Sequence, residues 1–542
     1  MKRPPIYFAG LDTEDDSNGT VTQLALVHER GRFTCQDRGQ MLDYIVGLVH
    51  KLGVTKRRVQ VWTTNLEYDA VNLWGERIAE ADLRFGRHAL YGITWRGAEF
   101  RDTLRHIPAS VKELGELVGL KKIESGRREK FGLERCVRDA AITYRAARLL
   151  HTFFKRWGEY PRMTLPSTAF AIWRRRFWRR DVTAPWPEIR NAARRAYYGG
   201  RVEPFAVGCF GHVRVVDVAS MFPWAMTAGL LPLPWGPYQR TRVLEPTGIY
   251  HATVRSELSP GPLPVRTQNG TIFPVGCFSG WWIGCELMLA RELGAKIRVR
   301  SGYRFELMVR PFDRYVRTMF GKKQRARGPM RTLFKLMLNS LYGKFGQTGE
   351  KVMVVPVRTF LKLKSAPLNF KTWNGLVFWN VDQSPPPWGN FVWPAIITAR
   401  ARVRLLRELM RLRRSGCRPL YCDTDAVMYQ GAASYPSQAR KIGDFELRGM
   451  FHKALILGKK EYGLQNQNGT WLLHVKGVPS GVRAPYLRTG RADYMLPSKI
   501  RGAARSGARA NVWRTVHKER RTDLRKRVQR SDGTLPPVRV AG

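Results

Sequence analysis

Two aspartates with a single residue between them constrain the fold of this chain more than any other feature. Asp423 and Asp425 lie in the segment Leu420 to Met428, which predicts a strand, a turn and a second strand. Residues i and i+2 of an extended chain point the same way, and two carboxylates on one face repel each other unless a cation lies between them. Oxygen ligands of this kind suit Mg²⁺ or Mn²⁺. We therefore expect a divalent-metal site here, which a third carboxylate, Asp217, could complete.

The charge of the chain points to its partner. Its 542 residues include 93 Lys and Arg against 43 Asp and Glu, a formal net charge of +50. A charge of this size implies a polyanion held over a large surface, and nucleic acid is the obvious candidate. A solvated surface without a partner is the alternative. The hydrophobic content of 44% is ordinary for a globular protein, so we expect two or three folded domains.

Cysteine usage and the lack of sorting signals predict the compartment. The 7 cysteines form no C-x-x-C pair and show no zinc-ligand spacing, so we expect reduced thiols and a metal held by oxygen. No stretch approaches ~18 uninterrupted apolar residues, and the apolar part of the N-terminal segment is too short for a signal peptide. We therefore expect no membrane association and a location in the cytoplasm of the host cell.

The composition changes along the chain. Residues 5–150 alternate apolar strands with helical segments, an α/β pattern, and residues 197–480 hold the acidic motifs. Clusters of Pro and Gly within that second region indicate loops or small inserted subdomains. The segment 173–180 combines two tryptophans with Arg, which suits either base stacking or burial at a domain junction. The Arg-rich tail from Lys499 is either a DNA-binding element or a solvated extension.

The segment from Arg331 to Gly343, which lies between Asp217 and Asp423 in the sequence, has helical composition. It ends at a glycine, which predicts that the helix stops there. Lys335, Asn339 and Tyr342 would then share one face of the helix. An ammonium group, an amide and an aromatic ring in one line suit a triphosphate, a polar edge, and a base or sugar. Alone, these residues indicate only surface and core, but the flanking acidic segments favour a nucleotide site.

Three segments together resemble motifs A, B and C of family B DNA polymerases. They are Asp217-x-x-Ser220-x-Phe222-Pro223, Lys335-x-x-x-Asn339-Ser340-x-Tyr342-Gly343 and Tyr421-x-Asp423-Thr424-Asp425, in that order. Three further segments resemble motifs of the protein-primed branch found in phages and linear plasmids. Tyr197-Tyr198-Gly199-Gly200 resembles the YxGG linker of that branch, Thr398 to Arg402 resembles its TxxAR motif, and Lys460 to Tyr462 resembles its KxY motif. The resemblance covers about residues 8–480.

This resemblance implies an α/β and α+β multidomain fold, with a ribonuclease H-like 3′-5′ exonuclease domain followed by a right-hand polymerase of palm, fingers and thumb. The expected domains are an exonuclease at 1–165, a linker at 166–200, palm and fingers at 201–480, and a thumb with a basic tail at 481–542. Inserts at about 227–310 and 347–391 resemble the terminal-protein regions of the family. Without the resemblance, these inserts would be ordinary loop-rich subdomains.

The resemblance also implies roles for the polymerase residues. Asp217 and Asp425 would ligate two divalent metal ions, Mg²⁺ or Mn²⁺, with support from Asp423. Lys335 would neutralise the incoming phosphates, and Phe222, where the family usually has Tyr, would reject a 2′-hydroxyl. Asn339 and Tyr342 complete the expected nucleotide site. The residues expected to bind DNA in this region are Tyr197, Gly199, Gly200, Thr398, Arg402, Lys460 and Tyr462.

The N-terminal domain carries a second acidic set. Asp12 and Glu14 follow an apolar strand with the same spacing of two, which alone would indicate only a surface pair. By the resemblance, Asp69 and Asp139 join them to hold two metal ions for hydrolysis of a mispaired 3′ end. Asn65, Tyr68 and Ser110 would bind the DNA. Position 135, where the family has a Tyr, is Arg, so we expect an active nuclease with weakened proofreading.

The expected partners are a DNA primer-template, a dNTP and a terminal protein that supplies the primer, with the chain a monomer or a heterodimer with that protein. Strand displacement is expected as well. An RNA-primed or primer-independent family B enzyme would share all of the catalytic motifs. A reverse transcriptase would have adjacent aspartates, whereas Thr424 separates them here. A non-catalytic DNA-binding scaffold would explain the charge equally well, but not two complete carboxylate sets.

Overall fold

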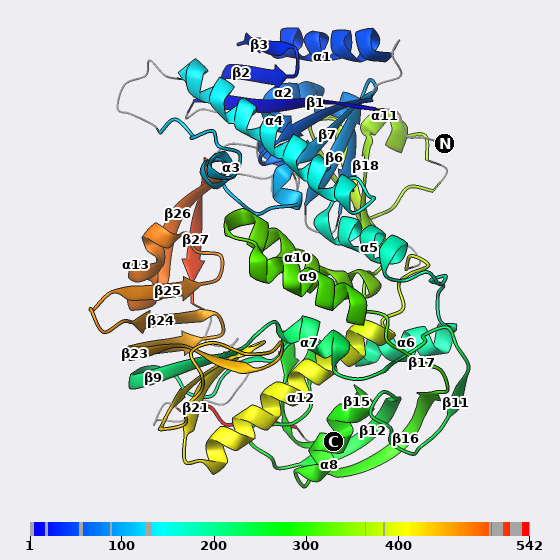
Figure 1. Ribbon diagram of the computed structural model, residues 1–542, viewed down its shortest axis with the longest axis vertical. Helices are drawn as coiled ribbons and strands as arrows, with labels where there is room; N and C mark the ends of the chain where they lie inside the picture. The colour runs from blue at the N-terminus through cyan, green and yellow to red at the C-terminus, as the bar shows by residue number, and fades with distance from the viewer. Residues whose placement is uncertain are drawn as a thin grey trace.

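The fold is taken from a computed structural model that describes residues 5–16, 20–53, 58–86, 89–124, 132–363, 365–382, 385–497, 500, 513–520 and 534–540. Figure 1 shows a sheet with covering helices at the top, a helical layer across the middle and a second sheet below it. No helix in these ranges is long and apolar enough to cross a bilayer. All seven cysteines are free thiols.

The N-terminal sheet has seven strands in the order β3-β2-β1-β4-β7-β6-β5. The strands are β1 (Ile6–Asp15), β2 (Val21–His28), β3 (Gly31–Cys35), β4 (Arg58–Thr63), β5 (Asp82–Phe85), β6 (Leu90–Trp95) and β7 (Ala98–Asp102). β1, β4 and β7 are parallel, and the outer strands are antiparallel. The accompanying helices are α1 (Arg38–Gly53), α2 (Leu66–Trp74), α3 (Val111–Leu117) and α4 (Gly132–Arg156), with 3₁₀ turns η1 (Gly75–Glu80) and η2 (Thr103–Arg105).

The period-two pattern of β1 explains how the sheet is covered. Tyr7, Ala9 and Leu11 are buried in the same core as α1, whereas Phe8 joins the core that includes α4. Gly10, on the α4 side, has no room for a side chain, because a Cβ there would collide with the backbone of α4 at Ala140 and Tyr144. The helix therefore crosses the strand in close contact.

Helices fill the middle of the molecule. They are α5 (Leu165–Arg176), α6 (Pro187–Ala196), α9 (Asp313–Arg325), α10 (Gly328–Phe345) and α12 (Val392–Arg414). Trp173 and Trp178 are buried here, and Trp173 donates a hydrogen bond to the carbonyl of Pro311. The tryptophans of segment 173–180 thus belong to the junction, and the alternative of stacking on DNA bases is not supported.

Helix α10 corrects one expectation from the sequence. It does not stop at Gly343 but continues to Phe345, and Gly346 follows it. Phe345 is fully buried and packs edge-on against Trp393 and Phe312, so burial of this ring outweighs the weak helix-breaking tendency of Gly343.

The central sheet, in the order β25-β24-β23-β9-β22-β21-β8, brings together segments far apart in sequence. Its strands are β8 (Val202–Pro204), β9 (Gly208–Val218), β21 (Arg418–Asp423), β22 (Ala426–Gln430), β23 (Phe445–Gly458), β24 (Glu461–Gln465) and β25 (Trp471–Val475). One face packs on α7 (Met221–Thr227) and α12 through Val216, Val218 and Leu405. The expected strand, turn and strand at residues 420–428 is confirmed by β21 and β22.

Two smaller sheets are built mainly from residues that lie between β9 and β21 in the sequence. The first, β11-β16-β12-β15-β28, contains β11 (Tyr238–Arg240), β16 (Lys296–Phe305), β12 (Ile249–Ser256), β15 (Val275–Ile283) and β28 (Arg539–Val540), with α8 (Gly284–Glu292) beside it. The second contains β18 (Glu350–Pro356), β20 (Leu376–Asp382) and β19 (Lys371–Trp373), with α11 (Val357–Phe360). Short ladders join β10 (Leu231–Pro232) to β17 (Met308–Val309) and β13 (Val265–Thr267) to β14 (Gly270–Ile272). Trp373 and Phe378 of the second sheet join the core of the N-terminal sheet.

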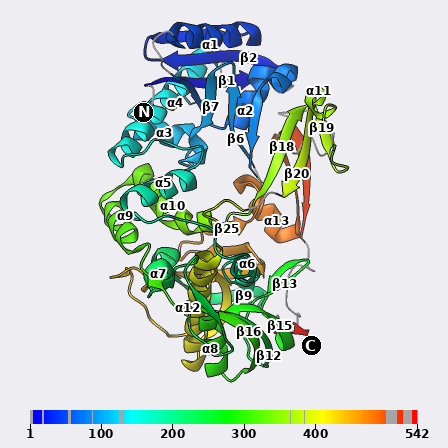
Figure 2. The ribbon, with the colours of Figure 1, turned by 90° about the vertical axis from the view of Figure 1, so that its right-hand side faces the viewer.

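The C-terminal region contains η4 (Ser480–Val482), α13 (Arg483–Thr489), β26 (Arg491–Pro497) and β27 (Trp513–Glu519). Figure 2 shows the C-terminus beside β15, with which β28 pairs in parallel. Leu535 donates a backbone hydrogen bond to Phe205, and Arg539 binds Glu257. Residues 534–540 are therefore packed against the body. Most of the Arg-rich tail, 501–512 and 521–533, lies outside the described residues.

Candidate active sites

Three strands of the central sheet bring Asp217 to the turn that holds Asp423 and Asp425. Asp217, near the end of β9, pairs with Ala426 of β22 on one side and Glu446 of β23 on the other. The amide of Val218 donates a hydrogen bond of 2.9 Å to the carbonyl of Asp425. The three aspartates, separated by some two hundred residues in sequence, thus meet at one end of the sheet.

The proximity of these carboxylates changes their acidity. Burial, followed by the negative charges of Asp217 and Asp423, raises the pKa of Asp425 to about 7. Burial also raises the pKa of Asp217, although Arg448 opposes this increase. Lys335 of α10 acts in the opposite direction on both aspartates. This crowding of negative charge is what a bound cation would relieve.

Two basic residues neutralise the aspartates in this structure. Arg448 of β23 donates to Asp217 Oδ2 at 2.8 Å and lies 3.0 Å from Glu446 Oε1. Lys460, of the KxY segment, donates to Asp423 Oδ1 at 2.6 Å. Sequence reasoning missed Arg448 and Glu446. Their i, i+2 spacing on a strand predicts a shared face, but nothing local indicates that β23 lies beside β9.

The expected nucleotide residues line the helix above this site. Phe222 of α7 stacks on Tyr342 of α10, with ring centroids 4.8 Å apart and an interplanar angle of 26°. Lys335 is exposed on the same helix, and Asn339 is half-buried between them in sequence. Tyr342 is largely buried, which raises its pKa. The structure therefore places a cation and a flat aromatic wall next to the aspartates.

The YxGG segment packs against the acidic turn from the opposite side. The amide of Thr424 donates to the carbonyl of Arg201 at 2.7 Å, directly after Gly200. Arg402 of α12 binds the carbonyls of Tyr198 and Gly199 at 2.7 and 2.8 Å, and both oxygens of Glu286 at 2.8 and 3.0 Å. Arg402 is only 3% exposed and Thr398 only 2%. The expected DNA contact is thus corrected for these two side chains, since both are buried behind the segment that they support.

The remaining expected DNA-binding residues occupy different environments. Tyr197 lines a cavity of about 1560 Å³ together with Ser340, Lys344 and Arg266, and Gly199 is exposed. Tyr462 packs between Tyr421 and His474, at ring distances of 5.3 and 5.0 Å. Tyr197 and Gly199 therefore face open space that DNA could enter, whereas Tyr462 is half-buried.

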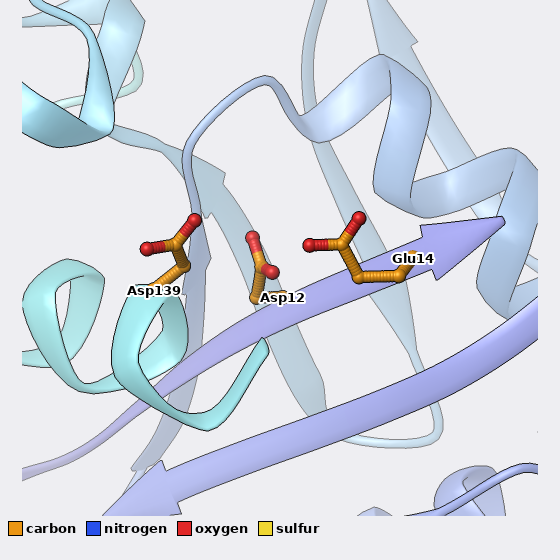
Figure 3. Close-up of side chains that lie close together, drawn as sticks. All are labelled: Asp12, Glu14 and Asp139. Atoms are coloured by element: carbon orange, nitrogen blue, oxygen red, sulfur yellow. The ribbon is translucent and has the colours of Figure 1, made fainter. Parts of the chain in front are cut away.

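The N-terminal domain assembles its own acidic cluster. Asp12 and Glu14 project from the same side of β1, and Asp139 projects toward them from α4, as Figure 3 shows. One carboxylate oxygen from each of the three lies within 4.8 Å of the others. Asp69 of α2 lies close enough to raise the pKa of Asp12, and it accepts a hydrogen bond of 2.9 Å from Thr13. Three of the four expected ligands therefore converge directly, with Asp69 behind them.

Burial and like charges raise the pKa of Asp12, and burial raises that of Asp69 and Asp139. Lys122 binds Asp139 Oδ2 at 2.6 Å. Arg135, at the position where the family has Tyr, holds Glu14 through two hydrogen bonds of 2.9 and 2.6 Å. The substitution therefore adds a cation that occupies one expected metal ligand.

The expected DNA-binding residues of this domain are partly engaged within the protein. Ser110 caps α3: its hydroxyl donates to Glu113 at 2.8 Å and accepts from the Glu113 amide at 3.3 Å. The Tyr68 hydroxyl donates to Asp15. The amide of Asn65 donates to Asp102 at 3.2 Å, and Asn65 takes a left-handed conformation before α2. Contact of Ser110 or Tyr68 with DNA would have to replace these hydrogen bonds.

Sequence comparisons relate the chain to known polymerases. Residues 133–359 match the family model of DNA polymerase type B, organellar and viral. The chain is 28% identical over 299 residues to the DNA-directed DNA polymerase of Enterobacteria phage PRD1, which covers 52% of each chain. It is 29% identical over 224 residues to a probable DNA polymerase of Neurospora intermedia, which covers 36% of this chain and 22% of the relative. The chain thus spans about half, or less, of the length of these curated relatives.

Structure comparison extends the similarity to nearly the whole fold. The phi29 DNA polymerase, solved with primer-template DNA and incoming nucleotide, superposes with a TM-score of 0.75 at 17% identity, over 96% of this chain and 99% of that one. The exonuclease-plus-right-hand architecture expected from the motifs is confirmed as the class of fold. Within that class, the chain is similar to the protein-primed branch of family B, as the motifs predicted.

Proposed function

We propose that this chain is a DNA-directed DNA polymerase that adds deoxynucleotides to a primer end on a DNA template. The observation that carries the proposal is the meeting of Asp217 with the Asp423–Asp425 turn across the central sheet. The net charge of +50 supports a nucleic-acid partner. Its relatives named as DNA polymerases, among them those of phages PRD1 and phi29, support the same activity.

The donor atoms in both acidic sites fit divalent metal ions. Among the residues that the structure describes, Asp217 Oδ1 and Asp139 Oδ1 are buried without a hydrogen-bond partner. A buried carboxylate oxygen without a donor is costly, and hard cations such as Mg²⁺ or Mn²⁺ prefer oxygen ligands. Asp217 and Asp425 would hold two ions in one site, and Asp12, Glu14, Asp69 and Asp139 two in the other. Bound there, the ions would activate the attacking oxygen and neutralise the leaving group.

The protein's own side chains would select and orient the nucleotide. Lys335 is exposed beside the aspartates, where an ammonium group can meet a triphosphate. Phe222, stacked on Tyr342, forms a wall where the sugar would lie, so its ring would exclude a 2′-hydroxyl. Lys460 would orient Asp423 through their ion pair.

We further propose 3′-5′ proofreading at the N-terminal cluster, which Arg135 would weaken because it competes with a metal ion for Glu14. The sheets within residues 227–310 and 347–391 are proposed to contact a terminal protein and to enclose DNA, which would allow strand displacement. The domain boundaries at 165, 200 and 480 are part of this proposal. Replication of a phage or plasmid genome would take place in the cytoplasm of the host cell.

Primer extension tests the activity. The full chain, a labelled primer on a DNA template, dNTPs and Mg²⁺ should yield longer products, and Asp425→Asn should yield none. An unextended primer would reject the proposal in favour of a non-catalytic scaffold. Priming needs a second assay, in which a labelled nucleotide, the terminal protein of the replicon and an origin fragment form a protein–nucleotide adduct. Extension of RNA primers without such an adduct would favour the RNA-primed alternative.

A further inference from the structure

Three cavities of this protein meet and form one path. The largest, about 1560 Å³, lies beside Tyr197 and the C-terminal half of α10. It shares Met163, Ser167 and Lys344 with a second cavity of about 710 Å³. The second cavity shares Arg162 and Met163 with a third of about 720 Å³ on the N-terminal domain. The path therefore leads from the polymerase region to the outside of the exonuclease-like domain.

The third cavity, which we call the outer cavity, is not part of either acidic site. It is bordered by Ile6 and Arg58, which pair at the start of the parallel strands β1 and β4. Asp12 and Glu14 lie toward the opposite end of β1. Neither the nuclease chemistry nor the polymerase chemistry accounts for the residues that line it.

Basic side chains dominate the outer cavity. Among the described residues, its lining includes the cations Arg58, Arg84, Arg101, Lys155 and Arg162 and one carboxylate, that of Glu99. Glu99 is already shared, because it forms ion pairs with both Arg58 and Arg101. Burial and the nearby Arg58, Arg84 and Arg162 lower the pKa of Arg101 to about 10. Such crowding of positive charge favours an anionic ligand.

The other ion pairs of these cations leave positive charge available. Arg162 lies 3.0 Å from Glu159, and Arg84 lies 3.7 Å from Asp82, at side-chain exposures of 41% and 51%. Lys155 is exposed and has no ion pair within the described parts of the chain. Tyr160 and His151 stack in the same cavity, with ring centroids 5.0 Å apart. Guanidinium groups beside an aromatic stack are what a strand of unpaired nucleotides requires.

The second cavity continues this charge toward the polymerase site. Arg162, Arg174, Arg175 and Lys344 line it, beside Phe170 and Trp388. The largest cavity adds Arg105, Arg194, Arg195, Arg266 and Lys351. Cations thus follow the whole path, and a chain of phosphates could run along it without a break.

We propose that the outer cavity binds the backbone phosphates of the single-stranded template ahead of the primer end, with Arg84 and Lys155 as contacts. This inference depends on the proposed function, because the strand must reach the outer cavity from the polymerase site. The largest and second cavities carry the strand, and the outer cavity holds it where it leaves the protein. The outer cavity is thereby a single-strand anchor distinct from both catalytic centres.

The test compares two double variants that lose the same charge. Arg84→Gln/Lys155→Gln removes two exposed cations from the outer cavity, and Arg30→Gln/Arg32→Gln removes two exposed cations near β3, the opposite edge strand of the same sheet. Binding of primer-template DNA is measured without divalent metal at several salt concentrations, with a long or a minimal 5′ template overhang. Loss of two single-strand phosphate contacts should reduce the slope of log Kobs against log salt by about 1.4 for the long overhang alone.

Each outcome of this test decides the proposal. A reduced slope only with the long overhang, and only for the outer-cavity variant, supports it. An unchanged slope, an equal reduction with the minimal overhang, or an equal effect of the β3 control overturns it. Both variants should extend a short primed template as the unmodified protein does. If the unmodified protein extends no primer, the proposed function has failed instead.

Discussion

The side chain of Thr424, in the turn between the two aspartates, packs directly on the Cα of Gly200. A Cβ at position 200 would come within 2.8 Å of Thr424 Cγ2 and 3.0 Å of its Oγ1, whereas at Gly199 nothing lies within 4 Å. Thr424 itself adopts a left-handed φ of 63°, so the turn is held in an uncommon conformation. The glycine pair of the YxGG segment therefore acts on the shape of the catalytic turn.

Gly200→Ala should lower the rate of nucleotide addition by about tenfold to a hundredfold, because a misplaced reactive group costs that much. Single-turnover extension measures this rate. Gly199→Ala is the matched control and should lower the rate much less, because its added Cβ meets no atom of the protein. Thr424→Gly removes the contacting atoms and tolerates the left-handed φ, so it should recover part of the activity in the Gly200→Ala background. Equal activity of both alanine variants would contradict this role.

Arg402→Ala should lower the free energy of unfolding by about 3–5 kcal/mol, because it leaves Glu286 buried without its partner. The control is Arg407→Ala on the same helix, whose ion pair with Glu292 spans 3.5 Å at exposures of 63% and 62%. Loss of such an exposed pair costs about 1 kcal/mol or less. Chemical denaturation of the two variants gives the comparison, and similar losses for both would count against the structural role of Arg402.

Arg135→Tyr should strengthen the nuclease. The bidentate ion pair with Glu14, at side-chain exposures of 29% and 21%, must be broken before a metal ion can use that carboxylate. An ion pair of about 1 kcal/mol corresponds to roughly fivefold weaker metal binding. We expect about fivefold tighter Mn²⁺ binding by calorimetry and faster 3′-end degradation. In an Asp12→Ala background the change should have no effect on degradation.

Metal binding at the polymerase site should depend on pH around neutrality. The pKa of Asp425 is raised from its ordinary 3.8 to about 7, so below pH 7 a metal ion must displace a proton. Apparent Mg²⁺ affinity should rise about tenfold per pH unit up to about pH 7 and then level off.

The stability of the metal-free protein should change with the opposite sign. Between pH 3.8 and about 7 the folded state holds a proton that the unfolded state has lost, so the contribution of Asp425 to stability falls as pH rises through this window. Asp425→Asn should flatten both profiles. A metal affinity that stays constant from pH 6 to 8 would show that this carboxyl group does not titrate there.

Phe222→Val should admit ribonucleotides, because it removes the ring that stacks on Tyr342. The incorporation ratio of dNTP to rNTP measures the effect, and we expect that ratio to fall by at least about tenfold. Phe222→Tyr restores the residue usual in the family and should retain discrimination. Equal ratios for all three proteins would rule out a steric role for this position.

The acidic centres could be predicted because the motifs that carry the resemblance to family B polymerases are local in sequence. The Asp-x-Asp and Asp-x-Glu spacings on strands are visible within a few residues. The order of the polymerase motifs then distinguished these carboxylates from ordinary surface pairs. The partners of these carboxylates were not predictable in this way. Arg448 reaches Asp217 only through the pairing of β23 with β9, and Arg135 reaches Glu14 only through the packing of α4 on β1.

Burial was the second kind of information that the sequence did not contain. Arg402 was expected to meet DNA because of the resemblance to the TxxAR motif, yet Glu286 and two backbone carbonyls satisfy its guanidinium inside the protein. Similarly, the end of α10 is decided by the buried ring of Phe345 and not by the glycine two residues earlier. The position of residues 534–540 likewise depends on contacts distant in sequence, with the edge of β15, with Phe205 and with Glu257.

The missing side chain of Gly10 has one more consequence. Asp139 and Ala140 are neighbours on α4, so the contact that forbids a methyl group at position 10 also fixes how far the helical carboxylate stands from the two on the strand. Any larger residue at position 10 would push α4 away from β1 and would move Asp139 away from Asp12 and Glu14. The hydrogen atom that Gly10 has in place of a side chain lies on the same face of β1 as Asp12 and Glu14, so it helps to set the spacing of the acidic cluster.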